Sequence, residues 1–309
     1  MADLLREATS SRVRQMSGES LLRLVKRYRQ AAAYLSRQAT NHQGRALVQH
    51  LVQRTYSLVY APPRLKRLWF FPALFHFLWR TFPASVLSHW SFVIASLVVF
   101  SSAAGLTAWL CRPGTEFSQL WLGEELTQLA ERVAARHQST DAVIPLFGRP
   151  YAFWIVLFNN WRVALLAFAS CLGFLLPGLY ILFANGKMVG AVIAYSWHQG
   201  TLSSLMGFIS PHGAIELPAI IFAGASGLAM AFRWLSPGDY PRLWALTTGA
   251  RQALPLLIGS LVLLLYAALI EAFVSPDDRL SDPSKMVLGA LHLSLLILYL
   301  IYPRPGSRK

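Results

Sequence analysis

The stretch Asn159–Arg233 decides the fold, and it reads NNWRVALLAFASCLGFLLPGLYILFANGKMVGAVIAYSWHQGTLSSLMGFISPHGAIELPAIIFAGASGLAMAFR. It contains three apolar runs, each interrupted by Gly or Pro. Polar side chains lie within or beside these runs: Asn160, Arg162, Asn185, His198, His212 and Glu216. An ionisable side chain near the bilayer centre costs about 2.5–3.5 kcal/mol, so it normally faces protein or water rather than lipid. The stretch therefore predicts membrane helices that pack around buried polar groups.

The whole chain has the composition of a multi-pass membrane protein. Its 309 residues are 55% hydrophobic with a mean hydropathy of +0.43, and several apolar runs are long enough to span a bilayer. A net charge of +14 would suggest nucleic-acid binding in a soluble chain. In a membrane protein, basic residues on cytoplasmic segments set the orientation. We therefore expect the lipid bilayer as a partner and no nucleic acid.

Several functional classes lack their motifs in this sequence. Cys111 and Cys171 have no CxxC neighbour, which argues against a disulfide framework or a structural zinc site. No P-loop and no HExxH motif is present, so ATP hydrolysis and zinc proteolysis are not expected. Residues 1–20 contain no apolar segment typical of a cleavable signal peptide. We expect no cofactor and no bound metal.

The chain divides into two predicted parts. Residues 1–85 form a basic, cytoplasmic helical hairpin followed by an interfacial helix at Arg64–Arg80, whose aromatic and basic side chains suit a membrane surface. Residues 86–309 form the transmembrane domain. Within it, residues 111–150 are an extracytoplasmic loop with an amphipathic helix. The fold class is an all-α polytopic membrane protein.

Six spans are predicted from the apolar runs. They are placed at about Val86–Leu110, Val163–Ala184, Met188–Leu205, His212–Phe232, Ala253–Val274 and Met286–Tyr302. An even number puts both termini on one side of the membrane. Half of the 28 lysine and arginine residues precede residue 86, so the termini are predicted to be cytoplasmic. The expected location is the bacterial inner membrane.

Four motifs resemble the stage II sporulation protein M family of bacterial and archaeal membrane proteins. They are Asn159-Asn160-Trp161-Arg162, Phe183–Gly190 (FANGKMVG), Pro211–Leu217 (PHGAIEL) and Ala223–Gly227 (AGASG). Arg54, Tyr56 and Tyr60 are similar to that family's cytoplasmic region, so the resemblance covers most of the chain. The namesake works with cell-wall-degrading partners during engulfment in spore formers, whereas many relatives occur in bacteria that do not sporulate. The resemblance implies an envelope-associated membrane protein.

The predicted site is a polar intramembrane cluster of Arg162, His212, Glu216, Glu271 and His292. His212 and Glu216 are four residues apart, so they share one helical face. They could form a proton relay, a metal half-site or a substrate contact, or they could simply pin the fourth span against a neighbour. The pinning role is preferred. We expect Arg162 to pair with Glu216 or Glu271 near the outer ends of the spans.

Small and turn-forming residues are assigned to helix turns and helix packing. They are Asn160, Asn185, Gly186, Gly190, Gly213, Gly224 and Gly227. Asn185–Gly186 is interpreted as a tight turn between two spans, because both residues tolerate the left-handed conformation. The sequence Gly224-Ala225-Ser226-Gly227 is interpreted as a close helix contact. The segment Thr201–Pro211 is considered as a re-entrant loop.

The predicted function is a non-enzymatic membrane component of a cell-envelope assembly, with no catalytic residue. Self-association as a dimer, or binding to other envelope membrane proteins, is expected. A permease or a lipid- or solute-handling transporter is the main alternative, because broken helices with polar residues build transport sites. An intramembrane serine protease is less favoured. Ser226 is fourteen residues from His212, about 21 Å down the fourth span, whereas His292 is only about 9 Å below the outer end of the sixth, so a Ser–His dyad does not line up.

Overall fold

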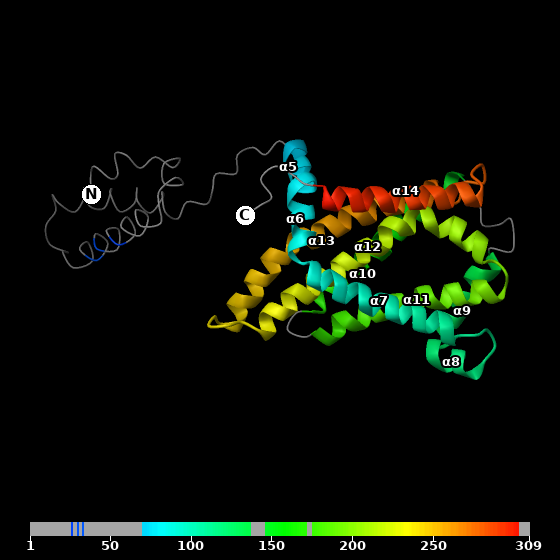
Figure 1. The fold of residues 1–309 in the computed structure, drawn as a ribbon, viewed down its shortest axis with the longest axis horizontal. Helices are drawn as coiled ribbons and strands as arrows, with labels where there is room; N and C mark the ends of the chain where they lie inside the picture. The colour runs from blue at the N-terminus through cyan, green and yellow to red at the C-terminus, as the bar shows by residue number, and fades with distance from the viewer. Residues whose placement is uncertain are drawn as a thin grey trace. The chain divides into compact units, whose positions relative to one another are not determined.

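The computed structural model (Figure 1) describes residues 26, 30, 33, 70–136, 146–171 and 175–302. The chain divides into two units, Met1–Phe70 and Phe71–Lys309. In the first unit, Lys26, Gln30 and Ala33 are helical. The rest of the predicted N-terminal hairpin lies outside the described residues, and the account below concerns the second unit.

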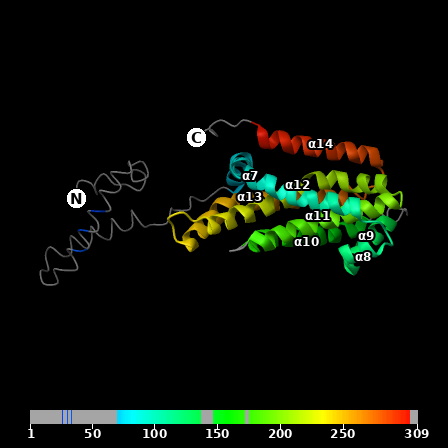
Figure 2. The same cartoon turned by 60° about the horizontal axis from the view of Figure 1, so that its bottom comes forward.

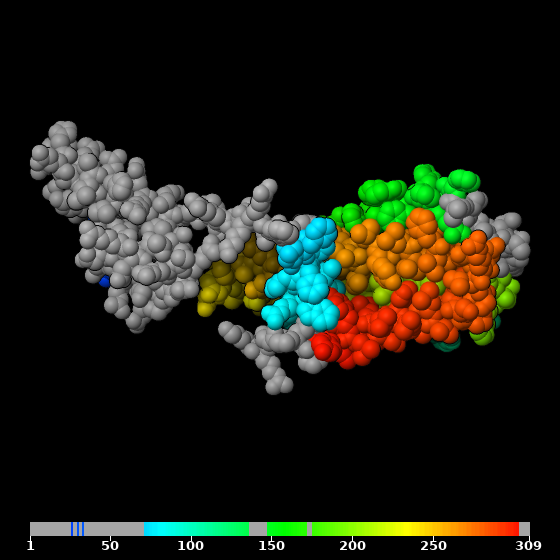
Figure 3. Space-filling view, turned by 90° about the horizontal axis from the view of Figure 1, so that it is seen from above, coloured from blue at the N-terminus to red at the C-terminus, as the bar shows by residue number. Residues whose placement is uncertain are grey.

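Three short helical segments lead into the transmembrane helices. They are α5 (Phe70–His76), a π-helical turn (Phe77–Thr81) and α6 (Phe82–Ser88). Phe82 is buried and packs with Phe222 and Leu256, and the Tyr299 hydroxyl donates a hydrogen bond to the Leu78 carbonyl. Figure 3 shows this segment lying across α13 and α14. α6 is therefore part of the helical core, and the predicted position of the segment at a membrane surface stays a prediction.

Six helices are long and apolar enough to cross a membrane. They are α7 (Trp90–Leu110), α10 (Arg149–Ala169), α11 (Leu175–His198), α12 (Leu202–Leu235), α13 (Arg242–Phe273) and α14 (Asp282–Ile301). Among the described residues there is no β-strand. The predicted all-α fold with six spans is confirmed. On α14, large apolar side chains such as Val287 and Leu291 are exposed, as a lipid-facing helix requires.

The predicted boundaries of the second and third spans need correction. Asn185 and Gly186 do not form a turn, because both lie in the middle of the continuous helix α11. The Asn185 amide donates to the Ile181 carbonyl at 2.8 Å, one turn back along its own helix. A Cβ atom on Gly186 would collide with the Phe100 carbonyl of α7. Gly186 therefore allows α11 to pack closely against α7. This packing stabilises α11 as a continuous helix at Asn185–Gly186, where the local sequence favours a turn.

Helix α12 is also longer than predicted. It continues from Leu202 through Pro211 and Pro218 to Leu235, so the segment considered as a re-entrant loop is helical from Leu202 onward. Figures 1 and 2 show α12 arching along its length and running beside α13. Proline removes a backbone hydrogen bond inside a helix and bends it. The 34 residues of α12 span about 51 Å, more than the roughly 30 Å bilayer core.

The predicted amphipathic loop forms two helices, α8 (Glu116–Leu122) and α9 (Glu124–Arg136). They are separated by Gly123, whose φ of 77° suits glycine. Both contribute buried residues to a cluster that includes Ala191 and Tyr195 of α11. The Lys187 ammonium group, also on α11, donates to the Trp121 carbonyl at 2.8 Å. This contact ties the loop to the transmembrane helices.

Candidate functional site

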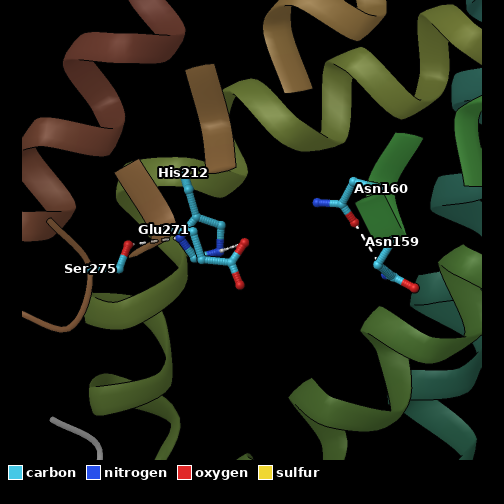
Figure 4. Close-up of polar contacts among 5 residues, drawn as sticks. All are labelled: Asn159, Asn160, His212, Glu271 and Ser275. Atoms are coloured by element: carbon cyan, nitrogen blue, oxygen red, sulfur yellow. Dashed lines mark hydrogen bonds and ion pairs between the residues drawn. The ribbon is translucent and has the colours of Figure 1, made fainter. Parts of the chain in front are cut away.

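Three of the five predicted cluster residues come together at one point. His212 and Glu216 lie one turn apart on α12, and Glu271 lies in the last turn of α13. One potential ligand atom from each side chain lies within 4.8 Å of the other two. The His212 Nε2 atom is 4.0 Å from Glu271 Oε2, as Figure 4 shows. The helix packing therefore gathers an imidazole and two carboxyl groups from two helices.

The other ring nitrogen of His212 is held by Ser275, which follows the end of α13. The His212 Nδ1 atom lies 2.8 Å from the Ser275 hydroxyl (Figure 4). The Ser275 amide donates to the Ile270 carbonyl at 2.9 Å, and its carbonyl accepts from the buried Lys285 ammonium group at 2.8 Å. Lys285 belongs to the first turn of α14. His212, Ser275 and Lys285 thus connect three helices and fix the direction of the imidazole.

Glu216 is the least satisfied member of the cluster. Its Oε2 atom is buried and has no hydrogen-bond partner. The side chain of Asn160, from α10, lies beside the Glu216 carboxyl group. The Asn160 carbonyl oxygen accepts from the Asn159 amide at 3.4 Å, and Figure 4 shows its amide nitrogen directed toward the His212–Glu271 pair. Three helices, α10, α12 and α13, therefore contribute polar side chains to one region.

The remaining two predicted residues are not among these three side chains. Arg162 contacts Asn159 at 3.3 Å, and among the described residues it makes no ion pair with Glu216 or Glu271 within 4 Å. It is two residues from Asn160 on α10, which places it about 200° around the helix. Because Asn160 faces the cluster, Arg162 faces away from it. The expected ion pair of Arg162 with Glu216 or Glu271 is therefore not formed. His292 instead contacts the Pro211 carbonyl at 2.8 Å and the Tyr266 hydroxyl at 3.1 Å, next to the cluster.

The glycines assigned to packing lie where backbones approach closely. A Cβ atom on Gly224 would lie 2.5 Å from Leu182, and one on Gly227 would lie 2.6 Å from the Ala167 carbonyl. One on Gly190 would collide with the Ala104 carbonyl of α7. Gly213 has only a side chain of its own helix nearby, that of Ile209. Small residues thus set the distances between α12, α11, α10 and α7.

Ser226 and Ser275 do not fit the geometry of a serine nucleophile. The Ser226 hydroxyl donates to the Ala223 carbonyl of its own helix at 2.6 Å and is fully buried. Ser275, His212 and Glu271 lie in the order nucleophile, base and acid, but Ser275 is also fully buried. A nucleophile needs access to its substrate as well as a base within hydrogen-bond reach. The cluster is better suited to holding a cation or a proton than to attacking a carbonyl group.

Ser275 and Lys285 are functional candidates that sequence reasoning missed. Both lie around the loop between α13 and α14, where a serine and a lysine are ordinary surface residues. The signal available in the sequence is weak: Lys285 follows Ser281-Asp282-Pro283, a helix start in which the Ser281 hydroxyl accepts from the Ser284 amide. That start places Lys285 in the first helical turn. Its burial against Ser275 depends on tertiary packing.

Comparison with known proteins gives one match. Residues 92–276 match the family model described as Stage II sporulation protein M. The matched region runs from α7 to Pro276, so it contains Asn160, His212, Glu216 and Glu271. None of the curated proteins and none of the solved structures compared with the chain matches it.

Proposed function

Because the chain belongs to the stage II sporulation protein M family, we propose that it is a non-enzymatic component of a cell-envelope assembly. The family's namesake acts together with cell-wall-degrading partners. This chain has six helices suited to a membrane, and its buried serines are inaccessible to substrate. Family membership is the observation that carries the proposal, because the six-helix fold by itself is compatible with many functions.

We place the protein in the bacterial inner membrane with both termini in the cytoplasm. If all six helices cross the membrane, we expect the segment before α7, the turn between α12 and α13, and the C-terminus on one side. Arg233 and Arg242 flank that turn, and half of the 28 lysines and arginines lie before α7. The distribution of positive charge supports a cytoplasmic location for this side.

A strain that lacks the protein tests the proposed function. We expect its peptidoglycan to have an altered muropeptide profile, which the full-length gene restores. The purified protein in detergent should not cleave isolated peptidoglycan, since any hydrolysis would come from a partner. An unchanged muropeptide profile would contradict the envelope role, and cleavage by the purified chain would contradict the non-enzymatic role.

Self-association is part of the same proposal. The long apolar faces of α10 and α14 are exposed in the single chain, and either one can be covered by lipid, by a second copy or by another envelope protein. Native mass spectrometry of the protein released from nanodiscs should show a dimer or a hetero-complex. A monomer at all detergent-to-protein ratios, with no co-purified membrane partner, would argue against an assembly role.

A permease is the second candidate, and the polar cluster is the observation that favours it. Polar groups buried between broken helices are how transporters bind solutes and ions, and α12 carries two prolines next to His212 and Glu216. Flux in reconstituted vesicles tests this function. Solute or ion uptake that is abolished by Glu216→Gln but kept by the exposed control Glu116→Gln would establish transport. Absence of flux in the wild-type protein would leave the assembly role as the better account.

A further inference from the structure

We propose that His212, Glu216 and Glu271 bind a divalent transition-metal ion of the Zn²⁺ class. These residues form the one group of three or more potential metal ligands that lie close together in the described part of the chain. The proposal concerns a site on this chain and does not depend on the envelope role proposed above.

The charge balance of the site favours a dication. Two carboxylates close together in a largely apolar bundle repel each other and lose hydration, which is costly. Arg162 faces away from them, and the Lys285 ammonium group is bound to the Ser275 carbonyl. A divalent cation neutralises two carboxylates completely when the imidazole is neutral. When both carboxyl groups are ionised, a metal ion therefore compensates a charge that the neighbouring basic side chains do not.

The ligand types select the metal class. One imidazole nitrogen with two carboxylate oxygens suits Zn²⁺, Mn²⁺, Fe²⁺ or Co²⁺, whereas Ca²⁺ and Mg²⁺ prefer oxygen ligands alone. Ligand atoms around Zn²⁺ lie about 2.0–2.2 Å from the metal, hence roughly 3.3 Å from one another. The three atoms here are within 4.8 Å of one another. Small side-chain rotations that leave the helices in place are enough to close the site.

The surroundings of His212 match those of a metal-bound histidine. A ligating histidine normally donates its second ring N–H to an oxygen atom, which fixes the tautomer and the ring orientation. His212 directs Nε2 toward Glu271, and Nδ1 lies 2.8 Å from the Ser275 hydroxyl. Lys285 in turn holds the Ser275 backbone. Ser275 is thus a positioning residue for the proposed ligand.

Glu216 supplies an independent indication that the site takes a ligand. Its Oε2 atom is buried without any hydrogen-bond partner, although buried polar atoms are nearly always paired. The Glu271 side chain is 24% exposed, so it is less enclosed than His212. A buried, unpaired carboxylate oxygen close to a second carboxyl group and an imidazole is the arrangement expected of a cation site.

Cobalt binding to the full-length protein in detergent tests the proposal. After treatment with a chelator, the wild-type protein should bind one Co²⁺ per chain, with visible absorption bands that Zn²⁺ abolishes by competition. Glu216→Gln, Glu271→Gln and His212→Gln should each weaken binding by at least about tenfold, and Ser275→Ala by about 10- to 100-fold. The matched controls Glu116→Gln and His198→Gln should bind as the wild type does. Gel filtration checks that each variant is folded.

The proposal is overturned if the wild-type protein binds no stoichiometric Co²⁺ or Zn²⁺, in which case the two carboxyl groups share a proton instead. It is also overturned if folded Glu271→Gln binds metal as the wild type does, which would mean an adventitious ion only. If Glu216→Gln or His212→Gln does not fold, Glu271→Gln decides the result, because its side chain is partly exposed and tolerates the amide.

Discussion

At the residue scale, the buried Lys285 side chain stabilises the structure next to the candidate site. Its ammonium group donates to the Ser275 carbonyl, and the Ser275 hydroxyl contacts His212. A buried carbonyl that loses its partner costs about 1–3 kcal/mol. The orientation of the imidazole at the candidate site therefore depends on a side chain from a different helix.

Replacing Lys285 should destabilise the protein measurably. We expect Lys285→Ala to lower the free energy of unfolding by about 1–3 kcal/mol, because the Ser275 carbonyl is left unpaired. Denaturant unfolding in mixed micelles measures the change. Arg279→Ala, a basic residue on the exposed loop nearby, is the matched control and should change stability by less than about 0.5 kcal/mol. Equal effects of the two variants would contradict the structural role of Lys285.

The two cysteines should resist thiol reagents. Cys111 and Cys171 are free and fully buried, and burial raises the pKa of the Cys171 thiol to about 11. Only the thiolate reacts, so about one Cys171 thiol in a thousand is reactive at pH 8. We expect maleimide labelling of the folded protein to be slow at pH 7–8, faster toward pH 10, and rapid after denaturation. Rapid labelling of the folded protein at pH 7 would contradict this burial.

The sequence spacing predicted which residues of one helix lie together in the cluster. The rotation of each helix about its axis determines which residues of the other helices join them. The four-residue spacing of His212 and Glu216 was sufficient to place them together on one helical face. The partner of Glu216 was not predictable, because it depends on which face of α10 and α13 turns inward. Asn160 faces inward, so Arg162, two residues further on, cannot. The rotation of α10 about its own axis cannot be read from a single sequence.

At the scale of the helices, α7 packs closely against α11 at two glycines of α11. Cβ atoms on Gly186 and Gly190 would collide with backbone carbonyl groups of α7. The same contact explains why Asn185–Gly186 was misread: Asn-Gly is a strong local turn signal, and helix packing overrides it. Pro211 misled in the same way, since a helix with neighbours can continue through a proline at the expense of a bend, as α12 also does at Pro218 inside the predicted fourth span.

Adding a side chain at the contact between α7 and α11 should push the two helices apart. We expect Gly190→Ala to cost about 1–3 kcal/mol, since the added methyl group has no room and the backbone must shift. The control is Gly105→Ala on α7, whose Cβ atom would have nothing within 4 Å; it should be neutral or slightly stabilising. Thermal unfolding of the purified variants compares them. Similar unfolding temperatures for both would show that the two helices are not in close contact.

At the scale of the whole molecule, apolar length predicted the number of spans correctly, and the charge distribution predicts their direction in the membrane. Six apolar runs gave six helices, although the second and third runs were divided at the wrong residues. The loop between α13 and α14, which carries Ser275, should be on the side opposite to the turn between α12 and α13. The proposed metal site would then be close to the extracytoplasmic end of α13.

Cysteine accessibility in right-side-out membrane vesicles tests the six-span arrangement most directly. In a background of Cys111→Ser and Cys171→Ser, a membrane-impermeant maleimide should label Asp278→Cys in the loop between α13 and α14. It should label Asp239→Cys, in the turn between α12 and α13, only after detergent is added. Labelling of Asp239→Cys in sealed vesicles, with Asp278→Cys protected, would contradict the orientation, and labelling of both would contradict the span between them.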